Sequence, residues 1–318
     1  MRKIMTAALA LILVMAAGCY REPIVYPVSN YYLAVTMHRT PGYEYEEEEP
    51  AEILSVNVYD HNTGKLVLHT YIRPKYHPVG MPEGGYIDGL QPGDYDFLVY
   101  NFDTNPTEVH SEERLGKVYA DTDVYGYSSL TPVIKAPDHL FTANIHEDVP
   151  YISAEDGVYY INADLSTVVE EWRVRVGGIK DLDKAESITV YVSGQCRGRM
   201  LGPDGDRIYE RSIVMFQGRK APNGADVVPQ GEEYVIYTPY TTFGRMPGMR
   251  YLMTVAVTGP DGSQYMLQED VTDIIEEHQD TDRTIDLEWD VTIEGRKQGG
   301  FNPTSEPWDP EVHTIEIS

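Results

Sequence analysis

The stretch Ile285-Asp-Leu-Glu-Trp-Asp-Val-Thr-Ile293 decides the fold class of this chain. Apolar side chains occupy every second position, and acidic or hydroxyl-bearing side chains stand between them. Because successive side chains of an extended strand point to opposite faces, this period of two predicts a strand with one face buried and the other in water.

The same alternation recurs along most of the chain. Turn signals such as Gly202-Pro-Asp-Gly205 and Gly259-Pro-Asp-Gly262 separate the alternating segments. Many short strands, broken by 27 Gly and 21 Pro, predict an all-β fold of antiparallel β-sandwiches rather than a parallel α/β sheet. The other predicted strands are Tyr31–Met37, Leu54–Tyr59, Leu66–Ile72, Tyr95–Tyr100, Glu171–Val176, Ser187–Val192, Ile208–Phe216, Tyr251–Thr258 and Val312–Ile317.

Two local expectations follow from this pattern. A single short helix is predicted at Val271–His278, with Thr272 as its cap and Ile274 and Ile275 packed inward. The final strand, Val312–Ile317, is predicted to pair within its own domain. We expect it to lie beside the strand at 285–293 or one of that strand's sheet neighbours, with Ile315 and Ile317 buried.

The N-terminal segment has the layout of a signal peptide. Two basic residues precede the apolar run Ile4–Ala17, which is too short to span a bilayer of roughly 30 Å. Cys19 follows Ala-Ala-Gly and resembles the cysteine of the bacterial lipobox, although Ala16 stands where Leu is usual. We therefore predict a lipoprotein signal peptide at residues 1–18 and acyl chains on Cys19, with plain secretory cleavage near Gly18 as the alternative.

Removing residues 1–18 from the 318 leaves 300, more than one hydrophobic core usually serves. We expect two domains, at residues 19–160 and 161–318. With Cys19 lipidated, Cys196 is the one remaining thiol, so no internal disulfide can form. Cys196 lies in a Gly-rich, turn-like setting and is predicted to be a small, partly buried residue rather than a catalytic thiol.

The amino-acid composition limits the classes of molecule that this protein can bind. A formal net charge of −26 repels nucleic acid, so we expect no DNA or RNA partner. The 25 Tyr against 6 Phe suit strands with a half-exposed face, where the ring packs and the hydroxyl stays wet. Tyr-rich surfaces also bind sugars and proteins.

No motif points to catalysis, a cofactor or a metal. His61, His69 and His77 recur every eight residues, and we interpret them as exposed loop and strand histidines. The stretch 121–126 has a trace of a calcium loop but lacks the later bidentate Glu, and Asp280-Thr-Asp282 is typical of a turn. We therefore expect a protein without enzymatic activity, and with no catalytic, cofactor-binding or metal-ligating residues.

Several segments together resemble one family. Ile87-Asp-Gly-Leu-Gln-Pro-Gly-Asp-Tyr-Asp-Phe-Leu-Val-Tyr-Asn101 is similar to the turn and buried strand of the fimbrillin-related lipoproteins of Bacteroidales. Segments in the order of that group follow at 176–182, 242–244, 268–273 and 300–317. The chain thus resembles the FimB-type fimbrial anchor and accessory proteins, among which an uncharacterised lipoprotein family is the most similar.

The resemblance implies two tandem transthyretin-like β-sandwiches and a lipid anchor at the cell outer membrane, with surface exposure. It also implies an anchor or accessory role in fimbria assembly or adhesion. The partners would be other fimbrial subunits, joined by strand addition, and a host or bacterial surface ligand. Polymerising relatives are cut in the loop after the first strand; here Arg39 lies in that loop but Pro41 follows, so we interpret Arg39 as an ordinary loop residue. A surface-tethered glycan-binding protein beside a nutrient importer is the alternative.

Overall fold

The computed structural model describes residues 30–38, 52–102, 104–153, 155–222, 234–278, 282–293 and the backbone of 314–316. Strands dominate these residues, and the one α-helix among them is α2 (Thr272–His278). Short 3-10 turns lie at Pro74–Tyr76, Leu115–Lys117 and Leu182–Lys184. The all-β prediction is confirmed.

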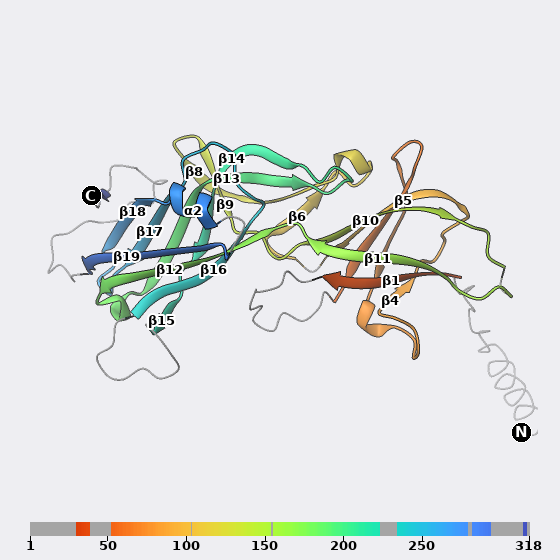
Figure 1. The fold of residues 1–318 in the computed structure, drawn as a ribbon, viewed down its shortest axis with the longest axis horizontal. Helices are drawn as coiled ribbons and strands as arrows, with labels where there is room; N and C mark the ends of the chain where they lie inside the picture. The colour runs from red at the N-terminus through yellow and green to blue at the C-terminus, as the bar shows by residue number, and fades with distance from the viewer. Residues whose placement is uncertain are drawn as a thin grey trace, which may run out of the picture.

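A seven-stranded sheet forms one half of the elongated molecule (Figure 1). Buried positions alternate with exposed ones in β11, and half-buried positions alternate with exposed ones in β3, as the period of two predicts. The strands, in spatial order, are β3 (Leu66–Ile72), β2 (Leu54–Asp60), β5 (Gly93–Asn101), β10 (Phe141–Val149), β11 (Tyr159–Thr167), β1 (Tyr31–His38) and β4 (Gly84–Tyr86).

Two further sheets form the other half. The smaller has the order β15 (Lys220–Pro222), β16 (Tyr234–Thr242), β12 (Glu170–Lys180) and β19 (Thr284–Thr292). The larger has the order β20 (Thr314–Glu316), β18 (Gln264–Asp270), β17 (Leu252–Thr258), β13 (Ser187–Met200), β14 (Arg207–Gln217), β9 (Thr131–Lys135) and β8 (Val124–Ser128), with β6 (Thr107–His110) and β7 (Tyr119–Thr122) attached to it through β13.

Most strand pairs are antiparallel, as expected, but each sheet also contains parallel pairs. These are β1 with β11, β12 with β19, β14 with β9, and β18 with β20. Each joins strands far apart in the chain, whose connection is long enough to return a strand in the same direction. The sheets are therefore mixed rather than purely antiparallel, a feature that periodicity cannot reveal.

Three clusters of buried side chains hold these sheets. One lies on the seven-stranded sheet around Leu33 and Phe97, and a second lies between the other two sheets around Trp172 and Ile285. A third cluster joins the halves, because Tyr100 from β5 packs in it with residues of the second half of the chain such as Phe243. Each fully buried large side chain stabilises the fold by about 1.5–3 kcal/mol.

The chain passes between the halves at β11 and β12, which follow one another with Val168 and Val169 between them (Figure 1). Strands β7 and β9 precede residue 160, yet they pair with β13 and β14. The two predicted domains thus share a sheet. The division into 19–160 and 161–318, and the tandem transthyretin-like arrangement, stay predictions.

The parallel contact between β12 and β19 requires a glycine. Gly178 has φ +71°, and a Cβ atom built there would lie 1.4 Å from the carbonyl oxygen of Trp289. The pairing register shifts at this point, between Gly177 and Ile179. Only a residue without a side chain allows the two backbones to approach so closely.

Two local predictions need correction. The helix forms where expected and buries Ile275, but the carboxylate of Asp270 caps it by accepting the Thr272 N–H at 3.0 Å. The Thr272 hydroxyl instead accepts a hydrogen bond from the backbone N–H of Tyr251.

The final strand pairs within the chain, but with β18 in the larger sheet rather than with β19 or β12. The prediction that it lies beside 285–293 is wrong, because β18 offers a free edge; the side chain of Ile315 and residue Ile317 lie outside the described part.

Candidate functional site

The edge strand β8 exposes aromatic side chains and carries no charge. Tyr125 and Tyr127 are 67% and 64% exposed, and Val124 beside them is also exposed. On one side β8 pairs with β9; among the residues that the structure describes, no strand pairs with its other side. An edge with open backbone groups and apolar side chains is suited to receive a further strand.

The turn that ends β8 adds a strained apolar tip. Ser129 and Leu130 both have positive φ, 45° and 69°, between the paired residues Ser128 and Thr131. Asn and Gly are the usual residues in such a two-residue turn, because a branched side chain there is strained. Leu130 is nevertheless present and 94% exposed. A bulky apolar residue held in this way is typical of a contact surface.

Strand β19, an edge of the smaller sheet, is protected by charge. Asp286, Glu288 and Asp290 lie on its exposed face. Arg175 donates to Asp286 at 2.7 Å and to Glu288 at 3.3 Å, and Lys180 donates to Asp290 at 2.7 Å. Charged side chains on an edge strand discourage pairing with another chain.

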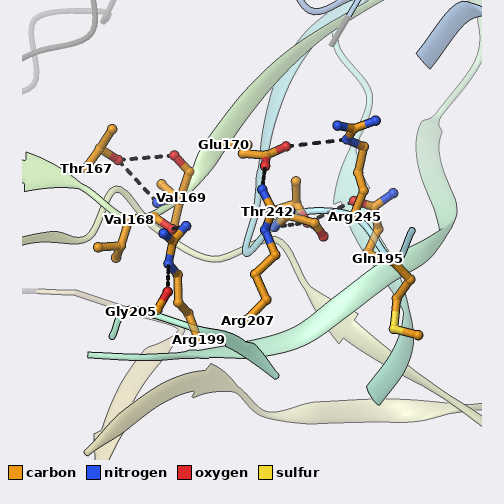
Figure 2. Close-up of polar contacts among 12 residues, drawn as sticks. Thr167, Val168, Val169, Glu170, Gln195, Arg199, Gly205, Arg207, Thr242 and Arg245 are labelled. Atoms are coloured by element: carbon orange, nitrogen blue, oxygen red, sulfur yellow. Dashed lines mark hydrogen bonds and ion pairs between the residues drawn. The ribbon is translucent and has the colours of Figure 1, made fainter. Parts of the chain in front are cut away.

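A second candidate site is a cluster of arginines around Glu170, at the start of β12. Figure 2 shows Arg207 and Arg245 converging on the Glu170 carboxylate, with Arg199 alongside. Arg207 donates to Oε1 at 2.5 Å, and Nε of Arg245 lies 3.7 Å from Oε2. Arg245 also lies over the ring of Trp172, 5.8 Å from its centroid.

Arg199 is fixed by backbone carbonyls rather than by an acid. Its Nη1 donates to the Val168 carbonyl at 3.0 Å, and its Nε donates to the Gly205 carbonyl at 3.1 Å (Figure 2). Burial, and then repulsion from Arg207, lower the pKa of the Arg199 guanidinium. Three arginines thus gather around one glutamate in a chain with a net charge of −26.

A pocket with a cavity volume of about 410 Å³ opens beside this cluster. It is lined by Arg207, Arg245, Pro247, Gly248, Tyr251 and Glu276. Guanidinium groups bind carboxylates and sulfates through paired hydrogen bonds. The arrangement can therefore accept a small anionic group, such as the acid of a sugar or of a peptide.

The predicted site residues fall in different places. Cys19, Arg39 and Asp280 lie outside the described residues. Cys196 is fully buried and lies inside β13 rather than in a turn, because the strand continues through a bulge at Gly194, which has φ +76°. Burial raises the pKa of the Cys196 thiol to about 11.

The three histidines do not converge. His69 hydrogen-bonds with Ser55 at 3.1 Å, and His77 contacts the Pro78 carbonyl on the surface. His61 instead meets His146, which lies 85 residues further along the chain, and their ring centroids are 4.2 Å apart. A regular spacing in sequence could not reveal a contact made by pairing between strands.

The suspected calcium loop is engaged in ion pairs. Asp121 lies 3.0 Å from His110 and 3.1 Å from Arg197, and Asp123 is exposed. Asp282 accepts a hydrogen bond from His278 at 2.7 Å, at the end of α2.

Among the described residues, no helix is long and apolar enough to cross a membrane.

Comparisons with solved structures find the same fold in two candidate adhesins. A candidate adhesin from Bacteroides ovatus aligns with 86% of this chain and 95% of its own, at a TM-score of 0.54 and 18% identity. A candidate adhesin from Bacteroides thetaiotaomicron aligns with 82% of this chain and 92% of its own, at a TM-score of 0.52 and 14% identity. The chain therefore shares the fold of these two proteins.

A third structure, the fimbrial anchor protein Mfa2 from Porphyromonas gingivalis, aligns with 81% of this chain and 88% of its own. The TM-score of this alignment is 0.45 and the sequence identity is 14%. No protein-family model and no curated protein matches the chain.

Proposed function

We propose that this protein is a lipid-anchored outer-membrane protein that serves surface fimbriae as an anchor or accessory component, in assembly or adhesion, and has no enzymatic activity. The observation that carries the proposal is the fold, which two candidate adhesins share over nearly their whole length. The N-terminal segment supports it, because a signal peptide that ends before Cys19 would export and tether the acidic body.

Strand β8 is the proposed joining edge. It leaves one side open within the described structure and exposes Tyr125 and Tyr127 without any charge, and the turn that follows it exposes Leu130. A partner subunit that adds an extended segment here would gain main-chain hydrogen bonds along the strand and apolar contacts with these side chains.

The anchor is tested by Cys19→Ala in cells labelled with a fatty-acid analogue. The parent protein should carry the label and fractionate with the outer membrane. The variant should lose the label and either appear in soluble form or remain an uncleaved precursor. A variant that is processed and partitions like the parent protein would overturn the lipid anchor.

The fimbrial role is tested by deleting the gene in a strain that makes fimbriae. Loss of anchored fimbriae or of adhesion, restored by the parent gene, is the expected result. Unchanged fimbriae and unchanged adhesion would refute the role even if Cys19 is lipidated.

A second candidate function is binding of an acidic glycan, and the arginine-lined pocket favours it. Arg207 and Arg245 could hold a uronic acid carboxylate there. Binding of the soluble chain to uronic-acid glycans and to their neutral counterparts tests this function. Acid-dependent binding that Pro247→Trp abolishes, without a change in melting temperature, would support it; equal binding of neutral glycans, or none, would exclude it.

A further inference from the structure

Four polar side chains gather on one face of the seven-stranded sheet, away from the sites described above. Asp94 and Asp96 lie on β5, and two residues apart they point to the same face. His146 on β10 pairs directly with Asp96, and His61 follows the end of β2, where its backbone N–H donates to the Asp94 carbonyl at 3.1 Å. Three neighbouring strands thus hold the cluster.

Asp96 orients both imidazole rings. Its Oδ1 lies 3.1 Å from Nδ1 of His146, and its Oδ2 lies 3.0 Å from Nδ1 of His61. If each Nδ1–H donates to this carboxylate, Nε2 of each ring keeps its lone pair. A carboxylate that accepts from a metal-bound histidine in this way fixes the tautomer and the orientation of the ring. Asp96 is the least exposed of the four, with 19% of its side chain accessible.

Asp94 supplies an oxygen to the same place. Its Oδ1 is closed off from solvent and accepts no hydrogen bond, and Nε2 of His146 lies 3.5 Å from it. One potential ligand atom from each of His61, Asp94 and His146 lies within 4.8 Å of the others. Ligands bound to a zinc ion at about 2.0–2.2 Å lie roughly 3.3 Å apart, so small rotations of exposed side chains would close the site.

From this geometry we propose a binding site for a divalent first-row transition-metal ion, with Zn²⁺ as the fitting ion. His61, His146 and Asp94 are the ligands, and Asp96 is the positioning residue. Two imidazoles and one carboxylate suit zinc rather than calcium or magnesium, which take oxygen ligands. The remaining coordination position faces solvent, because both histidines are about half exposed. The bound ion would fasten the turn after β2 to β5 and β10.

The test is calorimetric titration of Zn²⁺ into the mature chain with Cys19→Ala, at a pH where the imidazoles are neutral. We expect one ion per chain and a rise in melting temperature that a chelator reverses. His61→Ala and His146→Ala should each weaken binding at least about tenfold, and Asp96→Asn by about 10- to 100-fold. Co²⁺ should give a visible absorption band that the histidine variants lack.

His77→Ala is the matched control, since that half-buried histidine belongs to no candidate ligand group among the described residues and its loss should leave binding unchanged. Melting temperatures without metal check that each variant folds. A parent chain that binds no Zn²⁺, or histidine variants that bind as tightly as the control, would overturn the proposal. Equally tight Ca²⁺ binding that survives His61→Ala would overturn ligation by imidazole.

Discussion

Strand β8, an edge of the larger sheet, and strand β19, an edge of the smaller one, lie in the same half of the molecule but expose opposite kinds of side chain to solvent. Strand β19 alternates a buried apolar face with acids that are 60% or more exposed, and it pairs two of those acids with Arg175. Strand β8 has no charged residue and exposes tyrosines instead. The acidic side chains of this chain thus cover the edge at β19 and are absent from the edge at β8.

The glycines at these two edges also differ, in the room that each leaves for a side chain. Gly178, where β12 meets β19, has positive φ and no room for a Cβ atom, whereas a Cβ atom at Gly126 in β8 would meet nothing within 4 Å. The backbone of β12 therefore lies tightly against β19 at Gly178, whereas β8 leaves room for a side chain at Gly126. An edge that contributes little to the core is free to be shaped by a partner.

The largest expected loss of stability follows from the difference in space around Gly178 and Gly126. Gly178→Ala should lower the free energy of unfolding by about 3 kcal/mol or more, because it forces both a strained backbone and a collision with the Trp289 carbonyl. Gly126→Ala, the matched control, should change it by no more than about 0.5 kcal/mol. Urea denaturation of the soluble chain measures both. Similar losses in the two variants would contradict the contrast.

A smaller effect is expected from the charges on β19. Asp286→Asn combined with Glu288→Gln removes both acids that pair with Arg175 and raise the pKa of its guanidinium. Because both acids are largely exposed, the free energy of unfolding should fall by at most about 1 kcal/mol. High salt should shrink the difference from the parent chain. A larger loss in the free energy of unfolding, or a loss that salt does not alter, would contradict this expectation. It would show that the ion pairs of Arg175 with these two acids are shielded from solvent.

The smallest effect concerns pH. Lys180 holds the pKa of the Asp290 carboxyl below its usual 3.8 in the folded chain. The stability from this pair is therefore present above pH 3.8 and is lost as the pH falls through the lower, folded-state pKa. Lys180→Gln should lower the melting temperature slightly at neutral pH, and the gap should close in acid. A gap that widens in acid would contradict this sign.

Periodicity was sufficient to predict the fold class and ten of the twenty strands among the described residues, because alternation is a local signal. It could not predict which strands become neighbours, so the parallel pairs and the place of β20 beside β18 were missed. The same limit hid the histidine cluster. His61 belongs with His146 and not with His69, and only the register of β5 with β10 and β2 brings them together.

The arginine cluster was also invisible in the sequence. Glu170, Arg207 and Arg245 come from three strands or their ends, and nothing in their spacing links them. By contrast, the exposed stretch from Val124 to Leu130 is a continuous segment without charge, and that signal could have marked β8 as an unusual edge.

We propose that fimbrial subunits join this protein at β8. Site-specific photo-crosslinking on fimbriated cells is the most direct test. A photoreactive residue replaces either Tyr127 on β8 or Glu288 on β19, and mass spectrometry identifies the crosslinked chain. We expect a fimbrial subunit to be crosslinked at position 127 and none at position 288, and we expect Leu130→Asn to reduce the yield of the crosslinked product. Equal products at both positions, or none at 127 on cells that carry fimbriae, would contradict it.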